Sequence, residues 1–378
     1  MTDSTSLDDP VEEACTLYAQ ATTAHAAGEV DMARALFSQA LRLFEAAEGP
    51  ASLNVAATLT CLGAIAEDQS AYAHATAYYQ RAVTIVDHDV THLGHDEAAR
   101  EGTEELGRLR LDAWRNLGRL RRIAGHFDDA ERLFRQALHL AEAFFGPDSD
   151  ETAWVCNDLG MVGKFAGHFT AAAQWYARAL TILTANHGGD DGALAALYHN
   201  LGGLEHARGA FANGEPWARR GLAIRVQTLG PEHPDVAADM AALAALLDGQ
   251  GKYDEAETLY HQALVIFRRT YGDEHYEIAV NLHNLAAIRQ AQGRFAEAEV
   301  LYQQVLAIKA KLFDPDNVEI ALTLHNLAML YTAMARDDEA AALLQRALAI
   351  FTRNLHDAHP HVCACREHLA LVQCQLPG

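Results

Sequence analysis

The sequence predicts an all-α chain: a right-handed superhelical solenoid of antiparallel helix pairs, with about eight repeats and a C-terminal capping helix. Three observations predict it. Glycine recurs at intervals of 42 residues, apolar residues inside each interval recur at helical spacing, and short segments containing Gly or Pro separate the helices. One helix pair cannot bury its apolar faces alone, so successive pairs are expected to stack.

The glycine ladder marks the turn inside each predicted pair. Its members are Gly125, Gly167, Gly209, Gly251 and Gly293. An aromatic residue follows each glycine by two positions, at Phe127, Phe169, Phe211, Tyr253 and Phe295. We expect each glycine to end the first helix of its pair in the left-handed conformation, which is cheap only for Gly.

The flanking helices follow from the residues on either side of these turns. Within 281–311, apolar residues recur at spacings of three and four, which is typical of amphipathic helices. The second helix opens with acids such as Asp254 and Glu255, which suit the positive end of a helix. Between repeats, Gly230 ends one helix and Pro234 can occupy the first turn of the next.

The period also predicts the organisation of the chain. Leu62 and Leu117 are 55 residues apart, thirteen more than the period, and a polar run accounts for the surplus. We therefore expect a disordered N-terminus at 1–10, repeats 1 and 2 at 11–86, an insertion at 87–107, repeats 3 to 8 at 108–362 and the capping helix at 363–378.

Composition narrows the classes of partner. The formal net charge is -22, from 51 acidic and 29 basic residues, which opposes binding to nucleic acid or to anionic membranes. The start of the sequence is polar and acidic, unlike a secretory signal, and no run of eighteen apolar residues is present. Six irregularly spaced cysteines suit free thiols in a reducing compartment, so a cytoplasmic protein is expected.

The repeated residues resemble a known family. Leu117-Gly118, Ala130, Phe134 and Ala137, with Trp114, resemble the tetratricopeptide consensus over about residues 14–376. The segments 282–286 and 324–328 and the Gly-Pro-Glu-His-Pro-Asp-Val-Ala linker at 230–237 are similar to the kinesin-light-chain and nephrocystin-3 subgroup. The resemblance implies that the first helix of each pair lines a concave groove.

Two columns of polar residues fall on these first helices. One column reads Asn116, Asp158, Asn200, Ala242, Asn284 and Asn326; the other reads Arg115, Asn157, His199, Ala241, His283 and His325. The amides could bind the backbone of an extended peptide, or instead bond neighbouring helices and order the stack. The histidines could titrate together or bind a metal, but we expect groove-lining polar residues and no metal site.

A stripe of cations stands out in the third repeat. Arg115, Arg119 and Arg122 follow one helix face, and Lys164, 42 residues after Arg122, is expected to extend the stripe. A guanidinium group binds a carboxylate through paired hydrogen bonds, so this stripe could bind an acidic partner. The alternative is intramolecular pairing of these arginines with Asp112, Asp158 or other surface acids.

These features predict a non-catalytic scaffold or adaptor that binds a peptide or protein segment, possibly acidic or carboxylate-bearing, without a cofactor. The expected binding residues are Arg115, Asn116, Arg119, Arg122, Asn157, Lys164, His199, Asn200, His283, Asn284, His325 and Asn326. The alternatives are a ligand-sensing or regulatory subunit of a signalling complex and a metal-dependent enzyme that uses the groove histidines. Against an enzyme, no phosphate-binding glycine loop or nucleophile motif is present.

Overall fold

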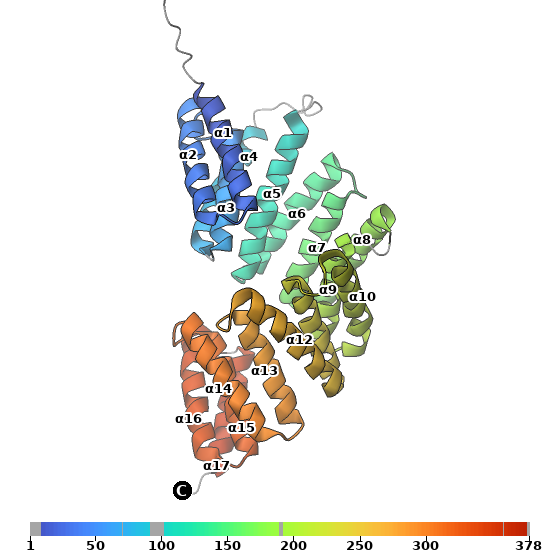
Figure 1. Cartoon of the computed structure of the whole chain (residues 1–378), viewed down its shortest axis with the longest axis vertical. Coiled ribbons are helices and arrows are strands. Elements are labelled where there is room, and N and C mark those ends of the chain that lie inside the picture. The colour runs from blue at the N-terminus through green and yellow to red at the C-terminus, as the bar shows by residue number, and fades with distance from the viewer. Residues whose placement is uncertain (1–8, 70, 91–101, 189–191, 358, 376–378) are drawn as a thin grey trace, which may run out of the picture. The chain divides into compact units, whose positions relative to one another are not determined.

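The chain folds into successive α-helices (Figure 1). The computed structural model describes residues 9–69, 71–90, 102–188, 192–357 and 359–375. Across these ranges there are seventeen α-helices and no β-strand. They divide between two compact units, residues 1–189 and residues 190–378. None of the helices in the described ranges combines the length and apolar character needed to cross a membrane.

Unit 1 contains four helix pairs. Its helices are α1 (Pro10–Ala26), α2 (Val30–Glu48), α3 (Leu53–Asp68), α4 (Tyr72–Val90), α5 (Gly102–Ile123), α6 (Phe127–Phe144), α7 (Asp150–Phe165) and α8 (Phe169–His187). Each odd-numbered helix packs against the even-numbered helix that follows it, and α3, α5 and α7 also contact one another in sequence order. We call the surface formed by successive odd-numbered helices of a unit its first-helix face.

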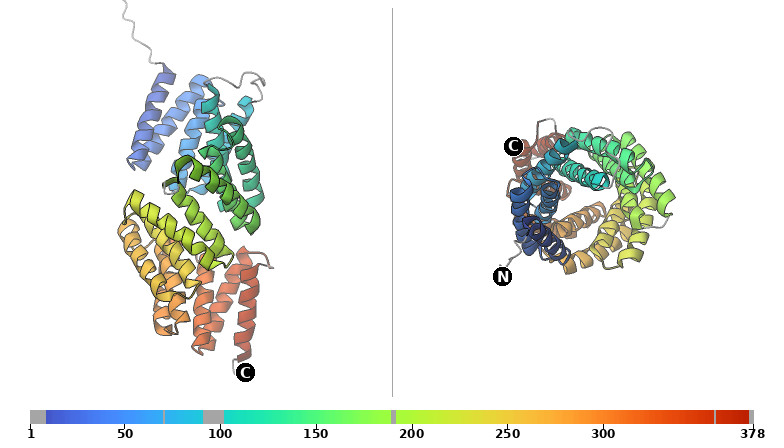
Figure 2. Two further views of the ribbon diagram at one scale, coloured as in Figure 1. Left: turned by 90° about the vertical axis from the view of Figure 1, so that its right-hand side faces the viewer. Right: turned by 90° about the horizontal axis from the view of Figure 1, so that it is seen from above.

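Unit 2 contains four further pairs and one additional helix. Its helices are α9 (Gly192–Ala207), α10 (Phe211–Leu229), α11 (Pro234–Asp248), α12 (Tyr253–Tyr271), α13 (Tyr276–Ala291), α14 (Phe295–Leu312), α15 (Val318–Ala333), α16 (Asp337–Asn354) and α17 (Pro360–Gln375). The final helix, α17, packs against α16. Figure 2 shows that the helices in each unit follow one another as hairpins.

The turns form as the glycine ladder predicts. Gly125 and Gly167 have φ angles of 79°, in the left-handed region that favours glycine. The other three ladder glycines also have positive φ. The side chain of Ser149 accepts a hydrogen bond from the backbone N–H of Thr152 at the start of α7, and Pro234 occupies the first turn of α11.

Small residues allow the two helices of a pair to approach closely. In α8, Ala172, Tyr176 and Ala179 are completely buried, and the Tyr176 ring lies against Gly160 of α7. A Cβ atom on Gly160 would lie 2.4 Å from that ring, so only glycine fits there. In unit 2 the buried Ala256, Tyr260 and Ala263 of α12 repeat this alternation of small and large residues.

The predicted all-α stack of about eight helix pairs and a terminal helix is confirmed. The domain boundaries at 1–10, 11–86, 87–107, 108–362 and 363–378 stay predictions. Residues 1–8 of the expected disordered N-terminus lie outside the described residues, as do 91–101 of the expected insertion and 376–378 of the expected cap.

Candidate binding face

The two polar columns interact with each other across successive first helices. The Arg115 side chain of α5 donates from Nε to Oδ2 of Asp158 in α7 at 2.7 Å. In unit 2, Nδ2 of Asn326 donates to Nε2 of His283 at 2.7 Å. The two residues of each pair are 43 positions apart, one more than the repeat period. A residue of the Arg115 column therefore contacts the residue of the Asn116 column that lies in the next repeat.

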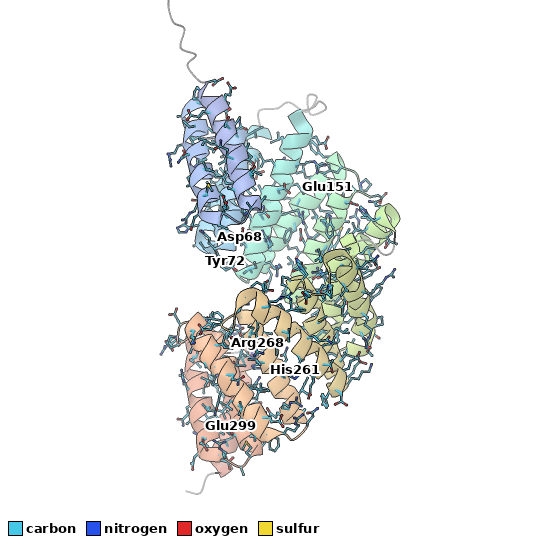
Figure 3. All side chains as sticks on the ribbon, viewed as in Figure 1. Asp68, Tyr72, Glu151, His261, Arg268 and Glu299 are labelled. Atoms are coloured by element: carbon cyan, nitrogen blue, oxygen red, sulfur yellow. The ribbon has the colours of Figure 1, made fainter. Side chains whose placement is uncertain are left out.

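The same separation recurs at the ends of the first helices. His25 and Asp68 are joined at 2.9 Å, and Nη1 of Arg108 donates to Glu151 at 3.0 Å. Figure 3 labels Asp68 on α3 and Glu151 on α7. Polar contacts between neighbouring first helices are therefore a regular part of the stack.

Each predicted histidine has a partner on another helix. Nδ1 of His199 lies 2.7 Å from Oδ1 of Asp239, and Nε2 of His325 lies 2.8 Å from Nδ1 of His368 in α17. Burial lowers the pKa of His283 to about 4, so this imidazole is neutral at pH 7. Within the described residues, no group of three His, Cys, Asp or Glu side chains is arranged to hold a metal ion.

The predicted asparagines differ in accessibility. Asn157 and Asn200 are buried, with exposed fractions of 7% and 9%. Asn116 and Asn284 are partly buried, and Oδ1 of Asn116 accepts from Arg119 at 3.3 Å. Asn116 and Asn284 therefore have more side-chain surface available to a partner than Asn157 and Asn200.

Two members of the predicted cation stripe are neutralised by carboxylates. Arg115 pairs with Asp158, one of the alternatives that the sequence left open. Nη2 of Arg119 donates to Oε1 of Glu67 at 2.7 Å, and the same carboxylate oxygen accepts from the hydroxyl of Tyr79 at 2.7 Å. These two arginines stabilise the stack of α3, α5 and α7 and contribute little free positive charge.

The other two cations of the stripe share an aromatic ring. The guanidinium carbon of Arg122 lies 4.9 Å from the centroid of the Phe165 ring, and Nζ of Lys164 lies 4.7 Å from the same centroid. Neither cation has a carboxylate within ion-pair distance anywhere in the described part of the chain. They are therefore the two cations of the stripe that form no ion pair in the described residues, although the charge of Asp158 also acts on Arg122.

Their electrostatics reflect this arrangement. Burial, with a smaller contribution from the Arg122 charge, lowers the pKa of Lys164 from its ordinary 10.5 to about 8. Burial also lowers the pKa of Arg122, while the charge of Asp158 acts in the opposite direction. Both charged forms are thus held in surroundings that favour an incoming anion.

Two exposed apolar residues follow the cations directly in the sequence, and sequence reasoning did not single them out. Ile123 at the end of α5 is 50% exposed, and Phe165 at the end of α7 is 53% exposed. They are 42 residues apart and each directly follows a cation, which was a readable signal. We call Arg122, Ile123, Lys164 and Phe165 the cation site.

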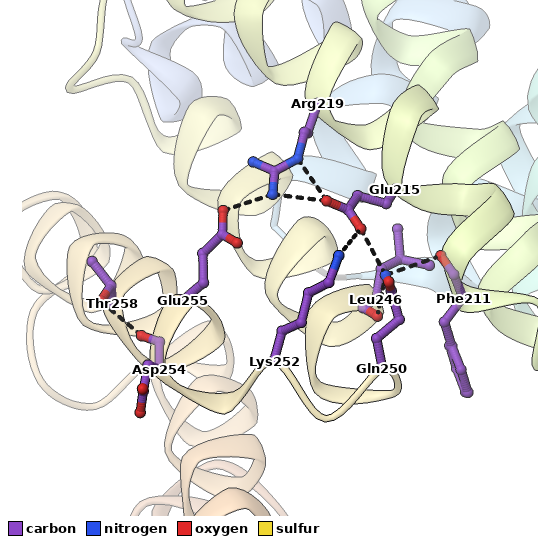
Figure 4. Close-up of polar contacts among 9 residues, drawn as sticks. All are labelled: Phe211, Glu215, Arg219, Leu246, Gln250, Lys252, Asp254, Glu255 and Thr258. Atoms are coloured by element: carbon purple, nitrogen blue, oxygen red, sulfur yellow. Dashed lines mark hydrogen bonds and ion pairs between the residues drawn. The ribbon is translucent and has the colours of Figure 1, made fainter.

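Unit 2 places an arginine and a lysine in a cluster with two carboxylates (Figure 4). Oε2 of Glu215 in α10 accepts from Nζ of Lys252 at 2.7 Å and from Nε2 of Gln250 at 2.9 Å. Its other oxygen accepts from Arg219, which also donates to Glu255 of α12 at 2.6 Å. The Lys252 hydrogen bond contributes most to lowering the pKa of Glu215 to about 2. We call these five residues the Glu215 cluster.

Comparison with known proteins supports the repeat assignment. The model for the tetratricopeptide repeat matches residues 12–87, 109–185, 193–264, 249–311 and 277–353. No curated protein matches the chain.

Similar solved structures come from several kinds of repeat protein. BtubC (BKLC) from P. vanneervenii is 24% identical, with a TM-score of 0.50 over 62% of this chain and 92% of BtubC. A Rap protein complexed with competence and sporulation factor is 14% identical, with a TM-score of 0.58 over 97% and 99% of the two chains. NprR in complex with its cognate peptide NprX is 12% identical, with a TM-score of 0.53 over 81% and 82%.

These structures share the fold, and the family model covers most of the chain, so the predicted tetratricopeptide resemblance is confirmed. The chain belongs to the tetratricopeptide repeat family.

Proposed function

We propose that this protein is a non-catalytic interaction scaffold whose cation site holds an acidic or carboxylate-bearing segment of a partner protein. Stacked repeats present extended surfaces suited to such segments. The proposal narrows the twelve predicted binding residues to a centre at Arg122 and Lys164.

One observation carries this choice. In a chain with a net charge of -22, Arg122 and Lys164 share one ring without a carboxylate partner in the described residues, although Arg115 and Arg119 on the same helix face are paired. Two neighbouring cations repel each other, and partial burial disfavours both charges. A carboxylate placed between them would relieve both effects through charge-assisted hydrogen bonds.

The apolar part of the site specifies the segment further. The exposed Phe165 ring lies against both cations, so a partner residue with an aliphatic or aromatic side chain can be buried on it beside the carboxylate. We therefore expect the segment to combine at least one Asp, Glu or terminal carboxylate with a neighbouring apolar residue.

Several contacts favour binding over catalysis. His283 is neutral and bonded to Asn326, and His199 is bonded to Asp239, which also lies 2.9 Å from Arg225. These histidines serve the packing of the stack in this arrangement. A regulatory subunit that senses a peptide is the second candidate, favoured by the same fold in the Rap and NprR complexes.

A peptide selection tests the ligand class. Random 12-residue peptides displayed on phage would be selected on the immobilised full chain and sequenced. We expect enrichment of acidic residues next to apolar ones, and we expect binding of a selected peptide to weaken as salt is raised from 50 to 500 mM, because the charges are partly exposed. Selection of peptides without acidic enrichment would contradict the proposal.

Matched variants test whether the peptide binds at the cation site. Arg122→Gln with Lys164→Gln should weaken binding of a selected peptide at least tenfold. The control is Arg132→Gln with Arg135→Gln on α6, because both of these arginines already pair with neighbouring acids of their own helix. Equal binding by the two double variants would place the ligand elsewhere.

A further inference from the structure

Lysine is rare in this protein. The sequence contains 25 arginines and only four lysines, Lys164, Lys252, Lys309 and Lys311. Arginine stays protonated in proteins, whereas the lysine amine can lose its proton and act as a nucleophile. The surroundings of the four lysines therefore decide where amine chemistry can occur on this chain.

Three of the four lysines are ion-paired with a carboxylate. Nζ of Lys252 donates to Glu215 at 2.7 Å, and Nζ of the buried Lys309 donates to Glu319 at 2.7 Å. Lys311 pairs with Glu274. Each of these three amines therefore already donates to an anionic partner inside the protein.

Lys164 has the opposite surroundings. Its Nζ lies over the Phe165 ring, the guanidinium of Arg122 lies over the same ring, and no described carboxylate pairs with it. Partial desolvation and a neighbouring cation both disfavour the ammonium form, and they lower its pKa to about 8. These are the two conditions that activate lysine nucleophiles.

We propose that Lys164 is an acylation site whose donor is an anionic acyl phosphate. The Arg122 guanidinium attracts the phosphate group of the donor and orients the acyl carbon toward Nζ. This inference extends the proposed function, because acylation would regulate the same site.

The reaction balances without a further reagent. The neutral Lys164 amine attacks the acyl carbon, a C–N bond forms, and the C–O bond to phosphate breaks. The nitrogen proton leaves with the phosphate, which departs as hydrogen phosphate. The product is an uncharged amide, so acylation leaves Arg122 as the only cation of the site and should weaken binding of an acidic segment.

Acetyl phosphate and the full-length protein test the proposal. Acetylation at each lysine would be followed over time by mass spectrometry, at pH values from 6.5 to 9.5. We expect Lys164 to be acetylated at least tenfold faster than Lys252 and Lys311, with a rate that rises with pH and levels off above about pH 8. Similar rates at the three lysines would overturn the proposal.

A variant and a second donor test the role of Arg122. Arg122→Gln should slow acetylation of Lys164 by acetyl phosphate at least fivefold, because it removes the phosphate contact and a charge that disfavours the ammonium. Arg121→Gln is the control, since Arg121 donates to Gln80 instead. An uncharged acetyl thioester should show a smaller dependence on Arg122, and equal slowing with both donors would overturn the acyl phosphate assignment.

The acetylation rate is measured without a peptide, so its outcome does not depend on whether the cation site binds one. Slow acetylation of Lys164 would contradict the acylation proposal and would leave the proposed function unaffected. Failure of the peptide selection would contradict the proposed function and would leave the acylation proposal unaffected.

Discussion

The cation site of unit 1 and the Glu215 cluster of unit 2 both contain an arginine and a lysine, but among the described residues these cations are paired with carboxylates only in the Glu215 cluster. In the Glu215 cluster, Lys252 and Arg219 both reach the same carboxylate, and the cluster joins α10 to the start of α12. In the cation site, Lys164 and Arg122 share a ring and have no carboxylate partner among the described residues. The first arrangement satisfies its charges internally, and we propose that the second leaves them for a ligand.

The difference bears on the stability of the two regions as well as on the proposed binding. A charge that is paired inside the protein contributes to folding, whereas a partly buried charge without a partner opposes folding until a ligand arrives. Substitutions in the two regions should therefore change stability in opposite directions.

The largest expected change is in the Glu215 cluster. Glu215→Gln should lower the free energy of unfolding by about 2 kcal/mol, because it weakens charge-assisted hydrogen bonds from Lys252 and Arg219. Urea denaturation at pH 7 measures this. An unchanged unfolding midpoint would show that the cluster contributes nothing to stability.

The pH dependence of the same variant sharpens that result. The folded pKa of Glu215 is about 2, below its ordinary 4.5, so its contribution is present above pH 4.5 and is lost as pH falls toward 2. We expect the stability difference between the wild type and Glu215→Gln to shrink across this window. A difference that stays constant with pH would contradict the assigned cause.

A smaller change of opposite sign is expected at the cation site. Lys164→Met should raise the free energy of unfolding at pH 7 by about 1 kcal/mol, because Met keeps the apolar stem and removes a disfavoured charge, with solvent reducing the effect. The folded pKa is about 8 and the ordinary value is 10.5, so the wild type should regain this stability as pH rises between them.

Urea denaturation at pH 7 and at pH 10.5 checks the Lys164→Met prediction. The matched control is Lys252→Met, which should destabilise the protein because it leaves Glu215 short of a partner. Destabilisation by both substitutions would remove the distinction between the two regions.

The smallest expected change lies at the exposed edge of the Glu215 cluster. Arg219 and Glu255 have side chains that are 44% and 47% exposed, so water screens their ion pair. Glu255→Gln should lower stability by only about 0.5 kcal/mol. A loss as large as that of Glu215→Gln would show that the pair with α12, and not the shared carboxylate, holds the cluster together.

The sequence was sufficient for the repeat fold because its signals are local and periodic. Gly125 and Gly167 adopt the left-handed turn expected of them, and the apolar spacing identified the helices. Gly160, whose missing side chain makes room for Tyr176, is a contact between two helices. Gly63 with Tyr79 and Gly118 with Phe134 repeat this contact at the same separation, so it too was available from the sequence.

The candidate site was only partly predictable. The stripe of Arg115, Arg119, Arg122 and Lys164 was readable from helical spacing and the repeat period. Which members are neutralised depends on residues far along the chain: Arg119 pairs with Glu67, 52 residues away and across the irregular step in the period. Arg115 and Asp158 are 43 residues apart, one more than the repeat period, so their pairing could be anticipated from the sequence.

Titration of the Lys164 amine tests directly whether this amine is without a carboxylate partner in the free protein. The four lysines can be reductively methylated with ¹³C-formaldehyde and followed by NMR, with Lys164→Arg used to identify the signal. We predict a titration midpoint near pH 8 for Lys164 in the free protein and a rise of this midpoint by at least one pH unit when a selected acidic peptide is bound. A midpoint at or above 10.5 in the free protein would mean that a carboxylate already pairs with Lys164, and it would contradict the account.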